Sequence, residues 1–185
     1  MRLYVACFII FLCILYICNF YSGQVAYVHD SGRVYYINNC RSEEEKKRKV
    51  EALHQLYLKS MKLFEHLKTH NTPGCVMLLK KYKFLKLQIE ELPNGMPNVF
   101  AYNVNKGDKI SICLSKENTL NELFFVILHE LSHGMTTEYS HNEEFWTNFK
   151  YLIKVADENN LYVNKNYAAQ PIPFCKHTLN HNPTF

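Results

Sequence analysis

Residues 119–141, "TLNELFFVILHELSHGMTTEYSH", hold the most informative pattern in this chain of 185 residues. The segment begins with Thr119 and Glu122, which have the spacing of a capping box and therefore mark the start of a helix. The residues after them are apolar almost without interruption, so we expect this helix to be buried on most of its faces. Gly134 is a natural end for it. The pattern predicts a buried helix with a polar C-terminal end.

The polar end of this helix contains His129, Glu130 and His133 in an H-E-x-x-H pattern. Residues four apart lie on one helix face, so the two imidazoles can bind one Zn²⁺ at about 2.0–2.1 Å. Glu130 points away from that face and can instead accept a proton from a water held by the metal. Chance produces the pattern in roughly 3% of sequences of this length and composition. A catalytic zinc site is therefore favoured over histidines satisfied by hydrogen bonds, and over a structural zinc that leaves Glu130 without a role.

A catalytic zinc site needs a third protein ligand, and His141 is the first choice. It follows a short connection after Gly134, and we expect it in the first turn of the next helix. Ser140 would cap that helix, with Glu143 as its capping-box partner. If the second helix folds back over the first, it brings His141 to the histidine pair.

Two other known ligand patterns would use a third ligand other than His141. The metzincin pattern H-E-x-x-H-x-x-G-x-x-H is excluded, because Thr136 and Tyr139 occupy the positions of its glycine and last histidine. Gluzincins take a glutamate from a later helix, which leaves Glu144 and Glu158 as alternative third ligands.

The remainder of the body alternates between strand and helix signals. Residues 24–37 are typical of a short hairpin, with an extended stalk as the alternative, and residues 42–70 predict a long helix capped at its start. Residues 75–93 are ambiguous but favour at least one strand, and residues 99–115 are the clearest hairpin. We expect the tail, residues 161–185, to be irregular. These elements predict an α+β fold with a small, mainly antiparallel sheet.

The N-terminus has a different character, since residues 3–21 are uncharged and apolar apart from one asparagine. This length suits a transmembrane signal anchor better than a cleaved signal peptide or a buried helix, which are the alternatives. The predicted organisation is an anchor at residues 1–22, a stalk or hairpin at 23–41 and a metallopeptidase-like domain at 42–185. We expect a single-pass membrane protein with its body on the extracytoplasmic side, or a secreted one if the signal is cleaved.

The overall charge of the chain indicates little about large partners. The formal net charge is +4 at pH 7, and acidic and basic residues are mixed along the chain. Nucleic-acid-binding domains usually carry a concentrated basic surface. We therefore expect no nucleic-acid partner.

Part of the chain, from Ala101 to about Cys175, resembles a family of zinc metallopeptidases related to the WLM and SprT-like domains and frequent in large DNA viruses. The matching pieces are "AYNVNKGDKISICL" at 101–114, "NTLNELFFVILHELSHGMTTEYSHNEEFWTNFKYLI" at 118–153 and "PFC" at 173–175. The resemblance implies a minimal zincin core, in which an edge strand of the sheet lies beside the zinc helix. Carried over to this sequence, it implies that His129, His133 and His141 are the zinc ligands and Glu130 is the catalytic base.

The resemblance also bears on the cysteines. Cys113 and Cys175 both lie inside the similar region, so it implies that these two form a disulfide. Cys40 and Cys75 lie outside that region and would form a second one.

Together these observations predict a membrane-anchored zinc metallopeptidase that hydrolyses peptide bonds in a protein or peptide substrate. An extended substrate would add to the edge of the hairpin at residues 99–114. The alternative is a catalytically silent, metal-binding structural protein of a membrane or virion that uses the same fold as a scaffold. An intact Glu130 weighs against it, because a scaffold needs no base.

Overall fold

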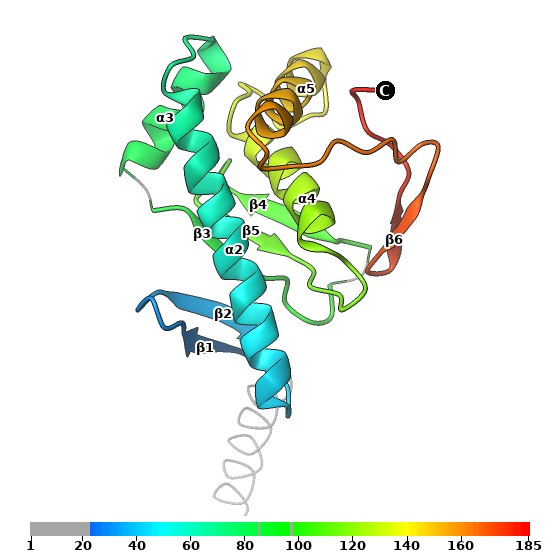
Figure 1. Ribbon diagram of the computed structural model, residues 1–185. Coiled ribbons are helices and arrows are strands. Elements are labelled where there is room, and N and C mark those ends of the chain that lie inside the picture. The colour runs from blue at the N-terminus through cyan, green and yellow to red at the C-terminus, as the bar shows by residue number, and fades with distance from the viewer. Residues whose placement is uncertain (1–22, 85, 97) are drawn as a thin grey trace, which may run out of the picture.

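The computed structural model describes residues 23–84, 86–96 and 98–185, which form an α+β fold (Figure 1). Its helices are α2 (Glu43–Leu67), α3 (Pro73–Phe84), α4 (Leu120–His133) and α5 (Glu143–Glu158). Its strands are β1 (Gln24–Val28), β2 (Val34–Asn38), β3 (Gln88–Glu91), β4 (Ala101–Val104), β5 (Lys109–Ile112), β6 (Ile172–Phe174) and β7 (His177–Leu179). The predicted α+β class is therefore confirmed for the described part of the chain. Its three-stranded sheet is mixed and not mainly antiparallel as predicted, because β3 pairs with β5 in parallel and β4 pairs with β5 antiparallel.

The long helix α2 is the element around which the body packs (Figure 1). The Ser42 side chain accepts a hydrogen bond from the backbone N–H of Glu45, so Ser42 is the N-cap of this helix, which the sequence predicted to be capped at its start. Glu45 does not return a capping-box bond but pairs with Lys116, at 3.2 Å. One face of the helix is apolar and buried, with its residues mostly three or four positions apart: Val50, Leu53, Leu56, Leu63, Phe64 and Leu67.

The central sheet has the strand order β3-β5-β4, with β3 parallel and β4 antiparallel to β5. Helices α2 and α4 contact each other and pack on this sheet, with α2 beside β3 and α4 beside β4 and β5. Ile110 and Ile112 of β5 are fully buried. Among the residues that the structure describes, strand β4 pairs with β5 alone, so the sheet edge that lies beside α4 is open.

The segment at residues 75–93, which was ambiguous in the sequence, contains the one strand that the sequence favoured, β3 at Gln88–Glu91, and helix α3 precedes it. Pro73 suits the first helical position, and the Thr72 hydroxyl accepts a hydrogen bond from the N–H of Cys75 at 3.3 Å. Cys75 and Leu78, three residues apart, are both fully buried. Helical spacing therefore governs the first part of this segment, and the strand follows it.

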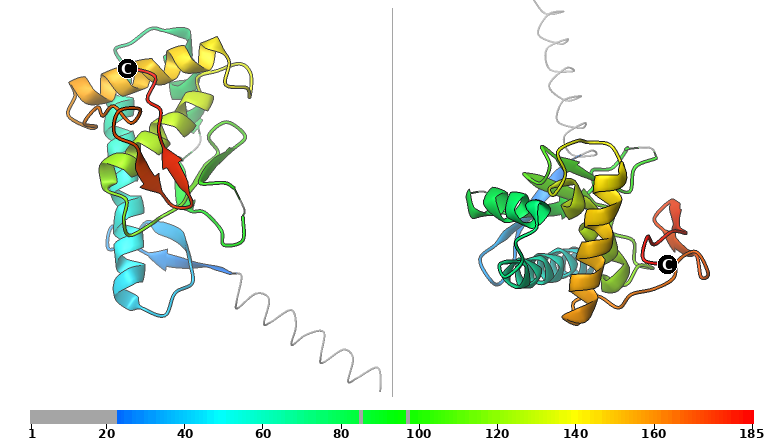
Figure 2. Two further views of the ribbon diagram at one scale, coloured as in Figure 1. Left: turned by 90° about the vertical axis from the view of Figure 1, so that its right-hand side faces the viewer. Right: turned by 90° about the horizontal axis from the view of Figure 1, so that it is seen from above.

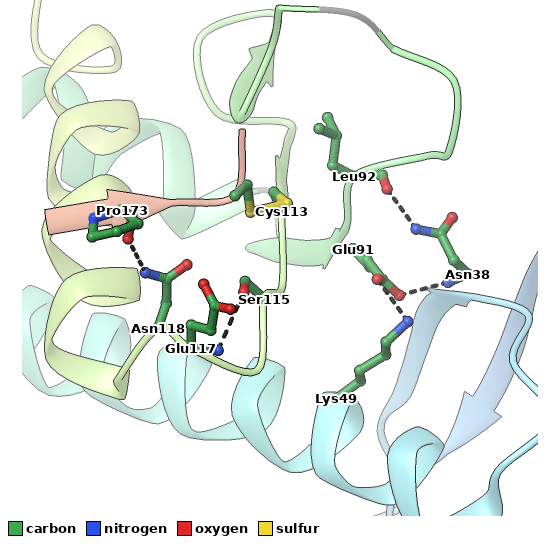
Figure 3. Close-up of a disulfide and its surroundings, with 10 residues drawn as sticks. Asn38, Lys49, Glu91, Leu92, Cys113, Ser115, Glu117, Asn118 and Pro173 are labelled. Carbon is green, nitrogen blue, oxygen red and sulfur yellow. Dashed lines mark hydrogen bonds and ion pairs between the residues drawn. A yellow bond between two sulfur atoms is a disulfide. The ribbon is translucent and has the colours of Figure 1, made fainter. Parts of the chain in front are cut away.

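The N-terminal hairpin of β1 and β2 packs on the body and does not stand apart as an extended stalk. Asn38 donates from its side chain to the Leu92 carbonyl at 2.7 Å, and from its backbone to the Glu91 carboxylate at 2.7 Å (Figure 3). Lys49 of α2 pairs with the same carboxylate at 2.8 Å, and both side chains are buried. This network joins the hairpin, α2 and β3.

The C-terminal tail is more regular than predicted. Strands β6 and β7 form a short antiparallel hairpin that lies alongside α4 (Figure 2). A disulfide between Cys113, just after β5, and Cys175 in the hairpin turn confirms the pairing implied by the family resemblance. The Asn118 side chain adds a hydrogen bond to the Pro173 carbonyl at 2.7 Å (Figure 3). The tail is therefore fastened to the end of the sheet.

The predicted second disulfide, between Cys40 and Cys75, is wrong. Both are free thiols in the described part of the chain. Cys40 precedes α2 and Cys75 follows it, and a helix of 25 residues is about 37 Å long. A disulfide requires Cα atoms within about 7 Å, so this pair cannot form.

Loss of the observed disulfide is expected to lower the free energy of unfolding by about 4 kcal/mol, because the bond joins residues 62 apart and restricts the unfolded chain. The comparison is between the double variant Cys113→Ser/Cys175→Ser and the wild type, in denaturant unfolding followed by circular dichroism. Cys40→Ser, which removes a free thiol, is the control and should change stability by less than about 0.5 kcal/mol. Equal unfolding midpoints for both variants would contradict this expectation.

Among residues 23–84, 86–96 and 98–185, no helix has the length and apolar character needed to cross a membrane. The anchor predicted at residues 3–21 lies outside these described residues.

Candidate metal centre

Three histidines meet at the C-terminal end of α4. His129 and His133 come from its last turns, and His141 comes from the connection to α5. Ligand nitrogens of the three rings all lie within 4.8 Å of one another, and the Nε2 atoms of His129 and His141 are 3.1 Å apart. Within the described residues, the structure thus brings together the three side chains that were predicted from the sequence to be metal ligands.

Helix α4 begins and ends at the predicted residues. Thr119 and Glu122 make both bonds of the capping box at its start, and Gly134 is the C-cap. A side chain at Gly134 would meet the Lys106 carbonyl at 3.1 Å and a methyl of Leu78 at 2.9 Å. The absence of a side chain therefore lets the end of the helix approach the β4–β5 turn closely.

The start of α5 differs from the prediction. Asn142, not Ser140, is its N-cap, and the Asn142 side chain accepts a hydrogen bond from the N–H of Phe145 at 3.0 Å. The Ser140 hydroxyl instead contacts Glu138 at 3.2 Å. Asparagine and serine are comparable N-caps, so sequence alone does not separate two candidates two residues apart. His141 therefore lies just before the helix and not in its first turn.

The ring of Phe145 packs against all three imidazoles of the histidine cluster. Phe145 is fully buried on α5, four residues after His141. Its ring centroid lies 4.9 Å from that of His129, 4.6 Å from His133 and 4.5 Å from His141. These contacts limit the rotamers of all three imidazoles and so orient their nitrogens.

The electrostatics of the cluster favour neutral imidazoles. Burial, with a smaller contribution from the neighbouring imidazoles, lowers the pKa of His129 to about 3, and burial, with smaller contributions from His141 and Lys106, lowers that of His133 to about 4. Burial also lowers the pKa of His141. The rings are therefore uncharged at neutral pH, which is the state that binds a metal. Two nitrogens about 2.05 Å from one tetrahedral ion are about 3.3 Å apart, close to the 3.1 Å observed between His129 and His141, so the donor set fits zinc.

Glu130 lies beside the cluster with only 5% of its surface exposed. Burial raises the pKa of its carboxyl group to about 8. Glu130 and all three histidines line one cavity of about 410 Å³. Perturbed acidic and basic groups that share a cavity are typical of catalytic sites.

The opposite wall of this cavity is the segment 98–103, which runs into the open edge strand β4. The Asn103 side chain of β4 donates a hydrogen bond to the Glu130 carbonyl at 2.6 Å. This bond fixes the edge strand against the end of α4. The relation of edge strand and histidine helix that the family resemblance implied is therefore present.

Lys106 is a structural part of the site that sequence reasoning missed. From the β4–β5 turn, its ammonium group donates to the carbonyls of Thr136 at 3.1 Å and Thr137 at 2.6 Å. It also lies 4.4 Å from the centre of the Tyr139 ring. These contacts hold the connection that carries His141. No local pattern pairs a turn lysine with a distant connection, so the sequence contained no signal for this role.

The two alternative ligands lie elsewhere. The Glu144 carboxylate accepts hydrogen bonds from the hydroxyl of Thr137 at 2.9 Å and from its N–H at 3.2 Å. Glu158 ends α5 and faces Lys154 at 3.7 Å. Neither glutamate belongs to the histidine cluster.

Comparison with known proteins agrees with this geometry. A protein of Acanthamoeba polyphaga mimivirus, described as uncharacterized, is 34% identical over 91 residues, which cover 46% of this chain and 45% of that protein. The chain thus aligns with less than half of this relative's length. No solved structure matches the chain. A family model described as the WLM domain matches residues 43–170, well over half of the chain. The chain therefore belongs to the WLM domain family, which is metalloprotease-like.

Proposed function

We propose that this chain is a zinc-dependent metallopeptidase. The observation that carries the proposal is the cavity in which three uncharged imidazoles and the buried carboxyl group of Glu130 face an open strand edge. Membership of a metalloprotease-like family supports the same conclusion.

His129, His133 and His141 would hold the ion through their ring nitrogens. A zinc ion in such a site supplies Lewis acidity, which polarises a carbonyl group and lowers the pKa of water. Glu130 acts as the general base, accepting a proton from the water that attacks the peptide carbonyl carbon. It then delivers this proton to the leaving amine nitrogen as the C–N bond breaks. One peptide and one water thus give a carboxyl and an amine product.

The substrate would bind as an extended chain along β4. Strand β4 pairs with β5 on one side. Residues 101–103 of this strand line the same cavity as Glu130. Backbone groups on an open strand edge bind an extended peptide by main-chain hydrogen bonds. Such bonds hold the peptide largely independently of its sequence, so specificity must come from side-chain pockets.

The proposal extends to the location of the protein. Residues 3–21 would anchor it in a membrane, with the body on the extracytoplasmic side. The Cys113–Cys175 disulfide supports that side, because disulfides persist in oxidising compartments. Protease treatment of sealed vesicles that contain the full chain tests the orientation, and a body exposed to the cytosol would contradict it.

Zinc content and cleavage of a broad peptide library, measured on the full chain in detergent, test the function. We expect one zinc per chain by elemental analysis, together with cleavage. Stoichiometric zinc without cleavage of any peptide would instead support a metal-binding scaffold. Well-folded protein that does not bind zinc would contradict both functions.

A further inference from the structure

A second cavity, of about 230 Å³, opens beside the candidate metal centre. It shares the lining residues Phe100 and His129 with the cavity that contains Glu130, so the two cavities are neighbours at the histidine cluster. Residues of α4, α5 and the second strand of the C-terminal hairpin line it, together with the segment that follows the hairpin. We call it the aromatic pocket; its other lining residues are Phe125, Val126, Trp146, Phe149, Thr178, Leu179, Asn180 and His181.

The chemistry of the aromatic pocket suits an apolar group. Phe125 and Phe149 are almost fully buried, with ring centroids 5.2 Å apart, and Trp146 lies 6.4 Å from Phe149. Within the described part of the chain, no aspartate, glutamate, lysine or arginine lines the pocket. An apolar cavity of about 150 Å³ is large enough to bind benzene. A cavity of this size therefore accommodates one aromatic or large aliphatic side chain, and a charged side chain would lose its hydration there.

The hairpin wall is held in position before any ligand binds. The Cys113–Cys175 disulfide and the hydrogen bond from Asn118 to Pro173 fasten the hairpin to the body. At the rim, the His181 ring meets Trp146 edge-on at 5.4 Å. A preformed pocket avoids much of the entropy cost of ordering a loop around a ligand, so its shape can discriminate between side chains.

We propose that the aromatic pocket receives a large apolar side chain of the substrate, from the residue bound next to the bond that is cleaved. This inference rests on the proposed peptidase function. A peptide that lies along β4 would pass Phe100 and His129, which line both cavities, so a side chain near the reacting carbonyl would lie next to the aromatic pocket. Peptides with Phe, Leu or Met at that position are then preferred to those with Ala, Asp or Lys. A few methylene groups in an apolar pocket are worth at least about 10-fold in kcat/KM.

Trp146 is the single tryptophan of the chain, so its fluorescence reports directly on the pocket. The full chain in detergent is titrated with N-acetylphenylalanine amide and, separately, with N-acetylalanine amide. We expect a saturable change in Trp146 emission with the first probe at concentrations where the second has no effect. This readout does not depend on turnover. Identical responses to the two probes would overturn the proposal.

Thr178→Phe is designed to fill the pocket from its exposed hairpin side without removing a core residue. Lys176→Phe places the same side chain on the same hairpin outside the pocket and is the matched control. We expect the phenylalanine probe to bind Thr178→Phe at least about 10-fold more weakly and to bind the control as it binds the wild type. Equal binding to both variants would contradict the assignment.

Cleavage of a peptide library, read by mass spectrometry, separates this inference from the function on which it rests. An apolar residue at one fixed position beside the cleaved bond, with the preference reduced in Thr178→Phe, supports both. Cleavage without that preference overturns the pocket assignment and leaves the peptidase intact. Probe binding to a zinc-loaded chain that cleaves nothing overturns the peptidase and with it the substrate role of the pocket.

Discussion

Glu130→Gln is expected to slow peptide hydrolysis by roughly 10²–10⁴-fold, the usual contribution of a general acid–base group. Glutamine has the shape of glutamate but cannot accept the proton of the attacking water. Glu130 does not belong to the group of side chains that would hold the metal ion, so its replacement should leave the zinc content unchanged. The rate is measured as kcat on a peptide found in the library, and zinc by elemental analysis of the same samples.

Glu117→Gln is the control for this change. It removes one exposed carboxylate from the body, outside the cavity that contains Glu130, and should leave kcat unchanged. A Glu130→Gln variant that keeps its zinc and retains activity within a few-fold of wild type would show that another group activates the water.

His141→Ala is expected to weaken zinc binding by more than the roughly 10–100-fold that loss of an outer-shell partner costs, because a direct ligand is removed. His141 is exposed and precedes α5, so the substitution should leave the fold intact. Zinc affinity is measured by competition with a chromophoric chelator, and folding by circular dichroism.

The alternative ligands provide the controls for His141. Glu144→Ala removes hydrogen bonds to Thr137, and Glu158→Ala removes a weak surface ion pair. We expect Glu158→Ala to bind zinc as the wild type does, and Glu144→Ala to do so within a few-fold. A large loss of affinity in Glu158→Ala, with His141→Ala unaffected, would show that the third ligand is wrongly assigned.

Features of the fold that depend on neighbouring residues were predictable from the sequence. The capping box at Thr119 and the stop at Gly134 place the two helical histidines at the end of α4. The β4–β5 hairpin follows from two strand-forming runs around a turn. The sequence was less decisive where two local solutions compete with similar energies. Asn142 caps α5 in place of Ser140, and the ambiguous segment 75–93 divides into helix α3 and strand β3.

Features that depend on distant residues were not predictable in this way. Lys106 reaches the connection before His141, and Asn103 reaches the Glu130 carbonyl, through contacts that exist only once the sheet packs on α4. The hairpin wall of the aromatic pocket likewise follows from a disulfide between distant segments. The pairing of Cys113 with Cys175 came from family resemblance and not from local pattern. The sequence therefore indicated the reactive groups, whereas the structure revealed what holds them.

The reversible dependence of cleavage on zinc is the measurement that tests the central claim most directly. The wild-type chain is stripped of metal with a chelator, assayed on a cleaved peptide, and assayed again after one equivalent of Zn²⁺ is added. We predict that cleavage disappears with the metal and returns with zinc, while circular dichroism shows the fold unchanged. Cleavage that persists in metal-free protein, or a folded, zinc-loaded chain that cleaves no peptide, would contradict the account.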